Sequence, residues 1–406
     1  MQARPNPTLR RSLNLPLLVL YGLGTTIGAG IYALIGEIAN VAGHQAPWAF
    51  LLASVLAGFT ACSFAELSAR YPRAAGAALY TQSGFGSVRV GQLVGLLVAV
   101  AGIVSSAALM NGFVGYLREF IAVDSAVLIG ICVALLTGVA AWGVTQSVII
   151  AGLISVIEVG GLLWIVLLGA DQVRLDAVVW PSVAPSTWGP MLWGGVLAFY
   201  AFIGFEDLVE VVEEVKGNRR TLPLAILLTL VISAGLYVVL VVTAIAALGP
   251  VGLGASDAPL AALYTHLTNQ DPVVISLIGV IAIVNGALIQ IIMASRVLYG
   301  LASRRQLPAV FARVNPATQT PLIATLFAGA LVLGLALVGN LAGLAQTTST
   351  LMLVVFAAVN LALWRVKAKL PPPAGIITFP RWLCLLGCLV CSGFALLSVS
   401  DWVVGG

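Results

Sequence analysis

Charged residues are scarce in this sequence. Asp, Glu, Lys and Arg make up 8% of the 406 residues, whereas hydrophobic residues make up 60%. Ordinary soluble domains carry about a quarter charged residues, so this composition excludes that class. The connections between the apolar runs are short and leave no room for a separate soluble domain. We therefore expect a protein of the lipid bilayer, without a nucleic-acid partner.

Histidine and cysteine are also sparse. The two histidines, His44 and His266, fall in predicted loops, and all five cysteines fall inside apolar runs. Cysteines in such runs behave as small hydrophobic residues and predict no disulfide framework. Cys384 and Cys388 lie one helical turn apart, but no histidine or carboxylate stands near that pair to complete a metal site, so we expect neither a metal nor an organic cofactor. The first apolar run lacks a signal-peptide cleavage site, so we expect no removable leader.

Long apolar runs are abundant. About 20 such residues suffice to cross the hydrocarbon core as a helix, so the sequence predicts an all-α polytopic membrane protein. We count eleven runs, near residues 13–36, 46–69, 90–118, 126–142, 146–169, 190–209, 223–248, 272–300, 321–338, 343–364 and 380–400.

The distribution of basic residues predicts an orientation. If the N-terminus is cytoplasmic, 17 of the 19 Lys and Arg residues lie on the cytoplasmic side, leaving only Arg118 and Arg174 outside. The basic tail 1–12 would then lie against anionic headgroups of the cytoplasmic membrane. Glu66, near the inner interface, indicates a packing or gating ion pair rather than a substrate ligand.

Glycine is concentrated in the first run. Gly22, Gly24, Gly28 and Gly30 stand within nine residues, around Thr25-Thr26. Glycine weakens a helix and permits backbone conformations closed to other residues. Two interpretations follow: close packing of two helices, or a deliberate break whose free backbone groups bind a ligand.

One carboxylate stands in the middle of the fifth run. Glu158 lies about twelve residues into this apolar segment, near the bilayer midplane. Intramembrane carboxylates are costly and usually face a cavity or a partner. We interpret Glu158 as a candidate proton carrier. The alternative is a permanently protonated carboxyl group hydrogen-bonded to a neighbouring helix.

The sixth run repeats the anomaly of the first. It sets Gly204, Glu206 and Asp207 between apolar halves. Adjacent helical residues point about 100° apart, so one carboxylate should line a cavity while the other faces a neighbour or an unwound turn. Interruptions in the first and sixth runs indicate two inverted five-helix repeats, residues 13–169 and 190–364, with a binding site at their interface. A linker, 365–379, and an accessory C-terminal helix, 380–406, complete the chain.

Four motifs in order then resemble the amino acid–polyamine–organocation transporter family. The segment 26–32 is similar to its first-helix signature, and 65–76 to its second-helix and loop pattern. The segments 202–223 and 295–321 resemble its sixth-helix and eighth-helix signatures.

The resemblance implies a ten-helix inverted-repeat core that works by alternating access. It implies that the substrate carboxylate is bound by backbone N–H groups around Thr26, Ile27, Gly28, Ala29 and Gly30. An anion is favoured at a helix N-terminus, where free N–H groups and the helix dipole attract negative charge. Carbonyl groups at Phe202, Ile203 and Gly204 would accept from the substrate ammonium group, with Tyr200 or Phe202 occluding the site. Glu206 corresponds to a gating or proton-sensing position.

Two departures from the family pattern stand out. Glu158 occupies a position where several proton-coupled relatives have lysine, so the lysine mechanism does not carry over. The carboxylate would either bind and release a proton itself or help to hold Na⁺. In addition, relatives commonly have twelve or more spans, whereas eleven are predicted here. The sequence therefore predicts no oligomeric state.

We predict a secondary active amino acid transporter, a proton symporter in which Glu158, Glu206 and Asp207 serve coupling or gating. The alternatives are a proton-independent exchanger or exporter of amino acids or amines, and a Na⁺-coupled transporter. A membrane-embedded enzyme would need a nucleophile–base pair, a metal set or a cofactor motif, and none is present. A structural or receptor-like protein would not need intramembrane carboxylates. Aromatic residues around Tyr200 and Phe202 favour neutral substrates, with Asp207 a weak hint of cationic ones.

Overall fold

The computed structural model describes residues 13–73, 76–143, 148–173 and 185–404. These residues are helical apart from their connections and one isolated bridge, Leu13–Val215. The long helices are α1 (Leu15–Ala42), α2 (Ala46–Arg70), α4 (Val88–Leu117), α5 (Ser125–Trp142), α6 (Val148–Leu168), α7 (Pro185–Phe199), α8 (Thr221–Gly254), α10 (Val273–Ser303), α11 (Leu322–Val338), α12 (Leu341–Lys369) and α13 (Arg381–Val404). Shorter helices are α3 (Gly76–Phe85), α9 (Pro259–Thr268) and the 3₁₀ segments η1 (Gly43–Gln45), η2 (Ala170–Gln172), η4 (Tyr200–Phe202), η5 (Phe205–Glu214) and η6 (Ala309–Ala312).

The predicted all-α polytopic fold is confirmed. Length and hydropathy alone qualify seven described helical stretches as membrane spans, one of which joins α1 to α2, and Gly152–Leu168 and Leu322–Val338 are shorter apolar helices. Each predicted run corresponds to one helix, with α7, η4 and η5 together forming the sixth. The sequence prediction missed α3 within the loop after α2. The predicted basic tail, 1–12, and the last two residues of the C-terminal segment lie outside the described residues.

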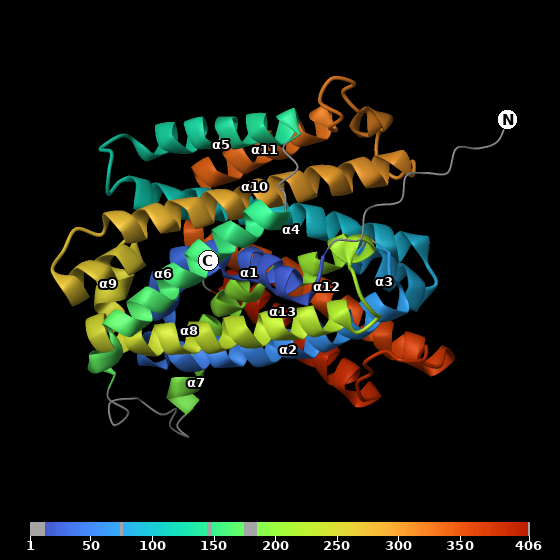
Figure 1. Cartoon of the computed structure of the whole chain (residues 1–406), viewed down its shortest axis with the longest axis horizontal. Helices are drawn as coiled ribbons and strands as arrows, with labels where there is room; N and C mark the ends of the chain where they lie inside the picture. Colours follow the sequence, from blue (N-terminus) through green and yellow to red (C-terminus); the bar gives the residue numbers. More distant parts are fainter. Residues whose placement is uncertain (1–12, 74–75, 144–147, 174–184, 405–406) are drawn as a thin grey trace.

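Helix α1 lies at the centre of the bundle (Figure 1). It packs against α6, α7, α8 and α10, and α4 in turn packs against α10 and α12. Leu18, Ile27 and Tyr32 on α1 are fully buried in this core. Because α1 is surrounded by protein rather than lipid, an interruption in its backbone need not face hydrocarbon.

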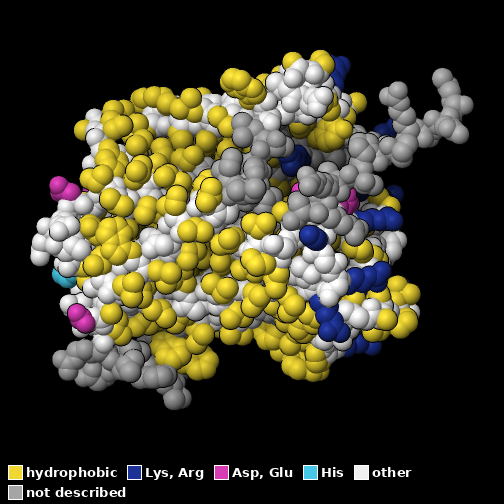
Figure 2. Space-filling view, in the orientation of Figure 1, with side chains coloured by type: hydrophobic (Ala, Val, Ile, Leu, Met, Phe, Trp, Pro, Cys, Tyr) yellow, Lys and Arg dark blue, Asp and Glu magenta, His cyan; other side chains and the backbone are white. Residues whose placement is uncertain are grey.

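The basic side chains gather at one end of the bundle. Figure 2 shows Lys and Arg concentrated there on the visible face. At this end Arg70, at the end of α2, donates to the carbonyl groups of Leu370 and Pro371, just after α12. Arg220, before α8, donates to the Gly375 carbonyl at 2.9 Å. The cationic ends of α2, α8 and α12 therefore share one face, which is called the basic end below.

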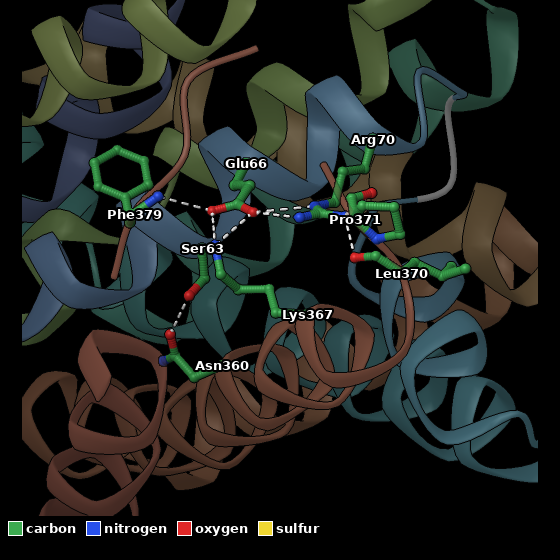
Figure 3. A network of polar contacts seen from close by, with 8 residues as sticks. All are labelled: Ser63, Glu66, Arg70, Asn360, Lys367, Leu370, Pro371 and Phe379. Atoms are coloured by element: carbon green, nitrogen blue, oxygen red, sulfur yellow. Dashed lines mark hydrogen bonds and ion pairs between the residues drawn. The ribbon is translucent and has the colours of Figure 1, made fainter. Parts of the chain in front are cut away.

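A buried ion network at the basic end anchors the segment between α12 and α13 (Figure 3). The Glu66 carboxylate accepts from both Arg70 and Lys367, at distances of 2.6–3.0 Å, and from the backbone N–H of Phe379 at 2.9 Å. Nearby, Asn360 accepts from Ser63 at 2.6 Å. Glu66 is fully buried, so its pairing joins α2 to α12 and to the linker. The expectation of an ion pair at Glu66 is confirmed.

Candidate functional site

The first interruption is confined to one residue of α1. Gly28 has φ −24° and ψ −107°, and the residues on both sides are helical. Gly30 has a different role, because a β-carbon there would stand 2.8 Å from the Cα atom of Ala201. The two interpretations of the glycine-rich stretch therefore apply to different residues. Gly28 breaks the helix, and Gly30 allows close packing.

The second interruption follows α7. The chain forms η4, then Ile203 is extended at ψ 132°, and Gly204 takes φ +129° before η5 begins. That φ favours glycine, and a β-carbon at Gly204 would also collide with the Thr25 carbonyl group. Segment η5 is ten residues long. Runs of 3₁₀ helix beyond three or four residues are uncommon and often mark a functional hinge. The predicted break in the sixth span is confirmed.

The two interruptions lie against each other. The Thr25 hydroxyl oxygen is 3.0 Å from the Gly204 carbonyl oxygen, to which it donates. The Tyr237 hydroxyl on α8 donates to the carbonyl groups of Thr26, at 2.8 Å, and Ala201, at 3.0 Å. Hydrogen bonds and close packing thus join both broken segments into one unit.

The remaining predicted binding residues surround this junction. Thr26, Ile27, Tyr200 and Phe202 are all buried. The Tyr200 hydroxyl is 2.8 Å from the Ser105 hydroxyl on α4. The Phe202 ring contacts the rings of Phe50 and Tyr237 edge-on. Ala29 belongs to α1, but its side chain lies outside the described part of the structure.

Glu158 lies on α6 beside the first interruption. It is fully buried, and neither carboxylate oxygen accepts a well-formed hydrogen bond from the described residues. The Asn285 side chain of α10 interacts with it. A β-carbon on Gly28 would stand 3.9 Å from Glu158 Oε2 and 3.8 Å from the Ala282 carbonyl oxygen. The Glu158 carboxylate and the Ala282 carbonyl oxygen therefore border a small gap beside Gly28, between α1, α6 and α10.

A cavity of about 860 Å³ opens beside the junction towards the basic end. Ser105 and Ile203 line it at the junction, and the exposed residues Glu210 and Arg304 line it at the surface. Other lining residues come from α1, α4, η5, α10 and α12, and they include Tyr21, Gly102, Glu214, Gln290, Arg296 and Thr348. The cavity is therefore accessible from the basic end.

Glu206 and Asp207 both line this cavity. The sequence predicted one carboxylate at a cavity and the other at a neighbour or an unwound turn; both line the cavity, and Glu206 also faces the turn at Gly204. Their surroundings still differ. Glu206 turns back to accept from the Gly204 N–H at 2.8 Å, where a negative charge is favoured at the start of a helical segment. Thr26, Ile27, Gly28, Gly30 and Glu158 are not among the lining residues.

The opposite side of the junction is tightly packed. The Tyr116 hydroxyl donates to the Tyr32 carbonyl at 2.9 Å and accepts from the N–H of Leu260 on α9. Tyr32 in turn donates to the Glu158 carbonyl at 2.8 Å. All three of Tyr32, Tyr116 and Leu260 are fully buried. The bundle is therefore closed between the junction and α9, and open on the basic side.

Sequence reasoning missed two polar residues at the junction. Ser105 stands in a small-residue-rich run that carries no distinctive signal. Tyr237 stands alone in an apolar run. Its phenol group was the only signal of a polar contact, because the hydroxyl group of a buried tyrosine normally finds a hydrogen-bond partner. Neither residue occurs in the four motifs.

Comparison with known proteins decides the family. The family model described as "Amino acid permease" matches residues 13–404. The chain belongs to the amino acid permease family. This confirms the resemblance to the amino acid–polyamine–organocation transporters. The chain is thus a multi-pass membrane transporter of amino acids rather than an enzyme.

Individual relatives agree with this assignment. The chain is 33% identical over 391 residues to an uncharacterized transporter of Mycobacterium tuberculosis, covering 94% of this chain and 86% of the relative. It is 29% identical to the mitochondrial cationic amino acid transporter 3 of Arabidopsis thaliana, covering 90% of this chain and 63% of that protein. It is also 29% identical to the cationic amino acid transporter 4 of Mus musculus, covering 92% and 62% respectively.

Proposed function

We propose that this protein is a proton-coupled amino acid symporter that works by alternating access. The substrate would bind where the interruptions at Gly28 and Gly204 meet, its carboxylate on the backbone N–H groups of residues 26–30. Its ammonium group would face the carbonyl groups of residues 202–204. The observation that carries the proposal is the contact between two broken helices beside an open cavity. Such half-helix ends are suited to charged substrate groups.

Glu158 is the proposed proton carrier. Its carboxylate is buried without a well-formed hydrogen bond, a costly arrangement for an ionised group. It also borders the gap next to Gly28, so its charge would act on the binding segment of α1. Glu206 and Asp207, which line the cavity, would act in gating.

Uptake into proteoliposomes tests the proposal. Purified protein should accumulate a labelled amino acid when the outside is more acidic than the lumen, and an uncoupler should abolish accumulation. Replacing external Na⁺ with choline should leave uptake unchanged under proton coupling. Loss of uptake in choline would instead indicate Na⁺ coupling, a second candidate that the Glu158 carboxylate and the Ala282 carbonyl oxygen beside Gly28 support.

Exchange is the main alternative mechanism. An obligate exchanger requires substrate inside the vesicle, whereas a symporter does not. Uptake should therefore be compared between empty vesicles and vesicles preloaded with the unlabelled amino acid, at equal pH on both sides. Uptake into empty vesicles at equal pH supports symport, and strict dependence on preloading refutes it.

Neutral amino acids are the proposed substrates, because Phe202 and Tyr200 make the junction aromatic and apolar. Cationic amino acids are a second candidate, favoured by a specific observation. Four carboxylates and two arginines line the cavity: Glu206, Asp207, Glu210, Glu214, Arg296 and Arg304. The Arabidopsis and mouse relatives are named cationic amino acid transporters. A thermal-shift screen against the twenty amino acids and common polyamines separates these candidates.

We also propose that the basic end faces the cytoplasm, as the excess of Lys and Arg favours. The cavity would then make this conformation inward-open in the cytoplasmic membrane. The repeats, 13–169 and 190–364, would rock about the junction to expose it to the other side. Labelling of a single cysteine introduced at Arg304 with a membrane-impermeant thiol reagent, in intact and in opened cells, tests the orientation.

A further inference from the structure

One buried hydroxyl bonds to both interruptions. Tyr237 lies in the middle of α8 and is fully buried. Its hydroxyl oxygen is 2.8 Å from the Thr26 carbonyl oxygen, two residues before the break at Gly28. It is 3.0 Å from the Ala201 carbonyl oxygen, three residues before the break at Gly204.

These carbonyl groups need a partner from outside their own helices. Carbonyl groups at a helix interruption lose their partner within the helix, and in a buried site water does not replace it. A tyrosine hydroxyl has one hydrogen to donate, so it serves the two acceptors by sharing that hydrogen or by alternating between them. A movement of either segment therefore changes the bond that is available to the other.

The Tyr237 ring is held firmly in place. It meets the Phe202 ring edge-on at 5.2 Å between centroids and the Phe50 ring at 5.9 Å. Phe50 and Phe202 also contact each other at 6.4 Å. The hydroxyl group is thus carried by a fixed ring between α2 and η4 rather than by a freely turning side chain.

We propose that Tyr237 is a positioning residue that couples the two interruptions, so that they change conformation together. The transport measurement below rests on the proposed function. The coupling itself does not, because the hydrogen bonds of Tyr237 are present in the protein without substrate. Removing the hydroxyl would leave two carbonyl groups without their shared donor and lower the population of the binding-competent arrangement. The apparent affinity falls by the same factor as that population.

The test compares Tyr237→Phe with Tyr80→Phe. Tyr80 is a matched control, because it is equally buried but its hydroxyl has no hydrogen-bond partner in the described structure. In proteoliposomes, Tyr237→Phe should raise the half-saturating concentration of a transported amino acid about ten-fold, the effect of one lost hydrogen bond, and change the maximal rate less than about two-fold. Tyr80→Phe should match the wild type.

Hydrogen–deuterium exchange in detergent tests the coupling without substrate. Backbone amides in residues 24–30 and 199–206 should both exchange faster in Tyr237→Phe and be unchanged in Tyr80→Phe. Faster exchange in only one segment, or equal behaviour of the two variants, overturns the inference. If wild-type vesicles transport no amino acid, the proposed function fails. Hydrogen–deuterium exchange still decides whether Tyr237 couples the two interruptions.

A measurement on the wild type covers the case in which Tyr237→Phe does not fold. Added substrate should protect residues 24–30 and 199–206 with the same midpoint concentration. Protection of the two segments at different concentrations contradicts coupling.

Discussion

Replacing Glu66 with glutamine should destabilise the protein more than any single change of an exposed charge. Glutamine keeps the shape of the side chain but removes the negative charge that two buried cations share. The side chains of Arg70 and Lys367 are only 4% and 12% exposed, so water does not take over its role. Arg70 keeps its bonds to the Leu370 and Pro371 carbonyl groups, whereas no other described carboxylate forms a salt bridge with Lys367.

The expected loss is about 3–5 kcal/mol, the usual cost of removing one partner from a buried ion pair. Unfolding entropy is about 2.1 cal/mol/K per residue, so for 406 residues this loss lowers the melting temperature by about 4–6 °C. Replacing Lys367 with methionine at the same time removes one unpaired cation. The double variant should therefore lose less than the sum of the two single changes.

The five free cysteines provide the assay. Cys132, Cys384 and Cys391 are buried and the other two are partly buried, so a thiol-reactive dye reports unfolding in detergent. Lys369→Gln is the control, because Lys369 is an exposed cation on α12, the helix that carries Lys367. If Glu66→Gln melts at the same temperature as Lys369→Gln, the network in Figure 3 does not stabilise the fold.

Three further predictions concern the junction. Glu158→Gln should abolish accumulation driven by a pH gradient while leaving counterflow partly intact, and full gradient-driven uptake would refute its role as proton carrier. Gly28→Ala should keep binding, because a methyl group fits 3.8 Å from the Ala282 carbonyl, whereas Gly28→Leu should lose it; equal substrate-induced thermal shifts for both would contradict this. Gly204→Ala should lower the melting temperature, because alanine disfavours φ +129°. Gly334→Ala should not lower it, because a β-carbon there meets open space. Equal melting temperatures for the two variants would show that the Gly204 backbone conformation does not require glycine.

The helices and the two breaks were largely predictable from sequence. A membrane span depends on about 20 consecutive residues, so local composition determines it. Gly204 beside two carboxylates, and Gly28 within an apolar run, likewise interrupt a local pattern. The prediction failed where the local pattern was weak: α3 is short, and η5, assumed to be α-helical, is a 3₁₀ segment.

Sequence alone thus determined the spans, the family resemblance and the positions of both interruptions, because each depends on neighbouring residues. Only the tertiary structure decided that Gly30 packs on Ala201, that Lys367 pairs with Glu66, and that Tyr237 bonds to both interruptions. The partners of Gly30 and Lys367 lie far away in the chain, and Tyr237 is separated from Thr26 by 211 residues. Such contacts follow from how whole helices pack, and no local pattern encodes them.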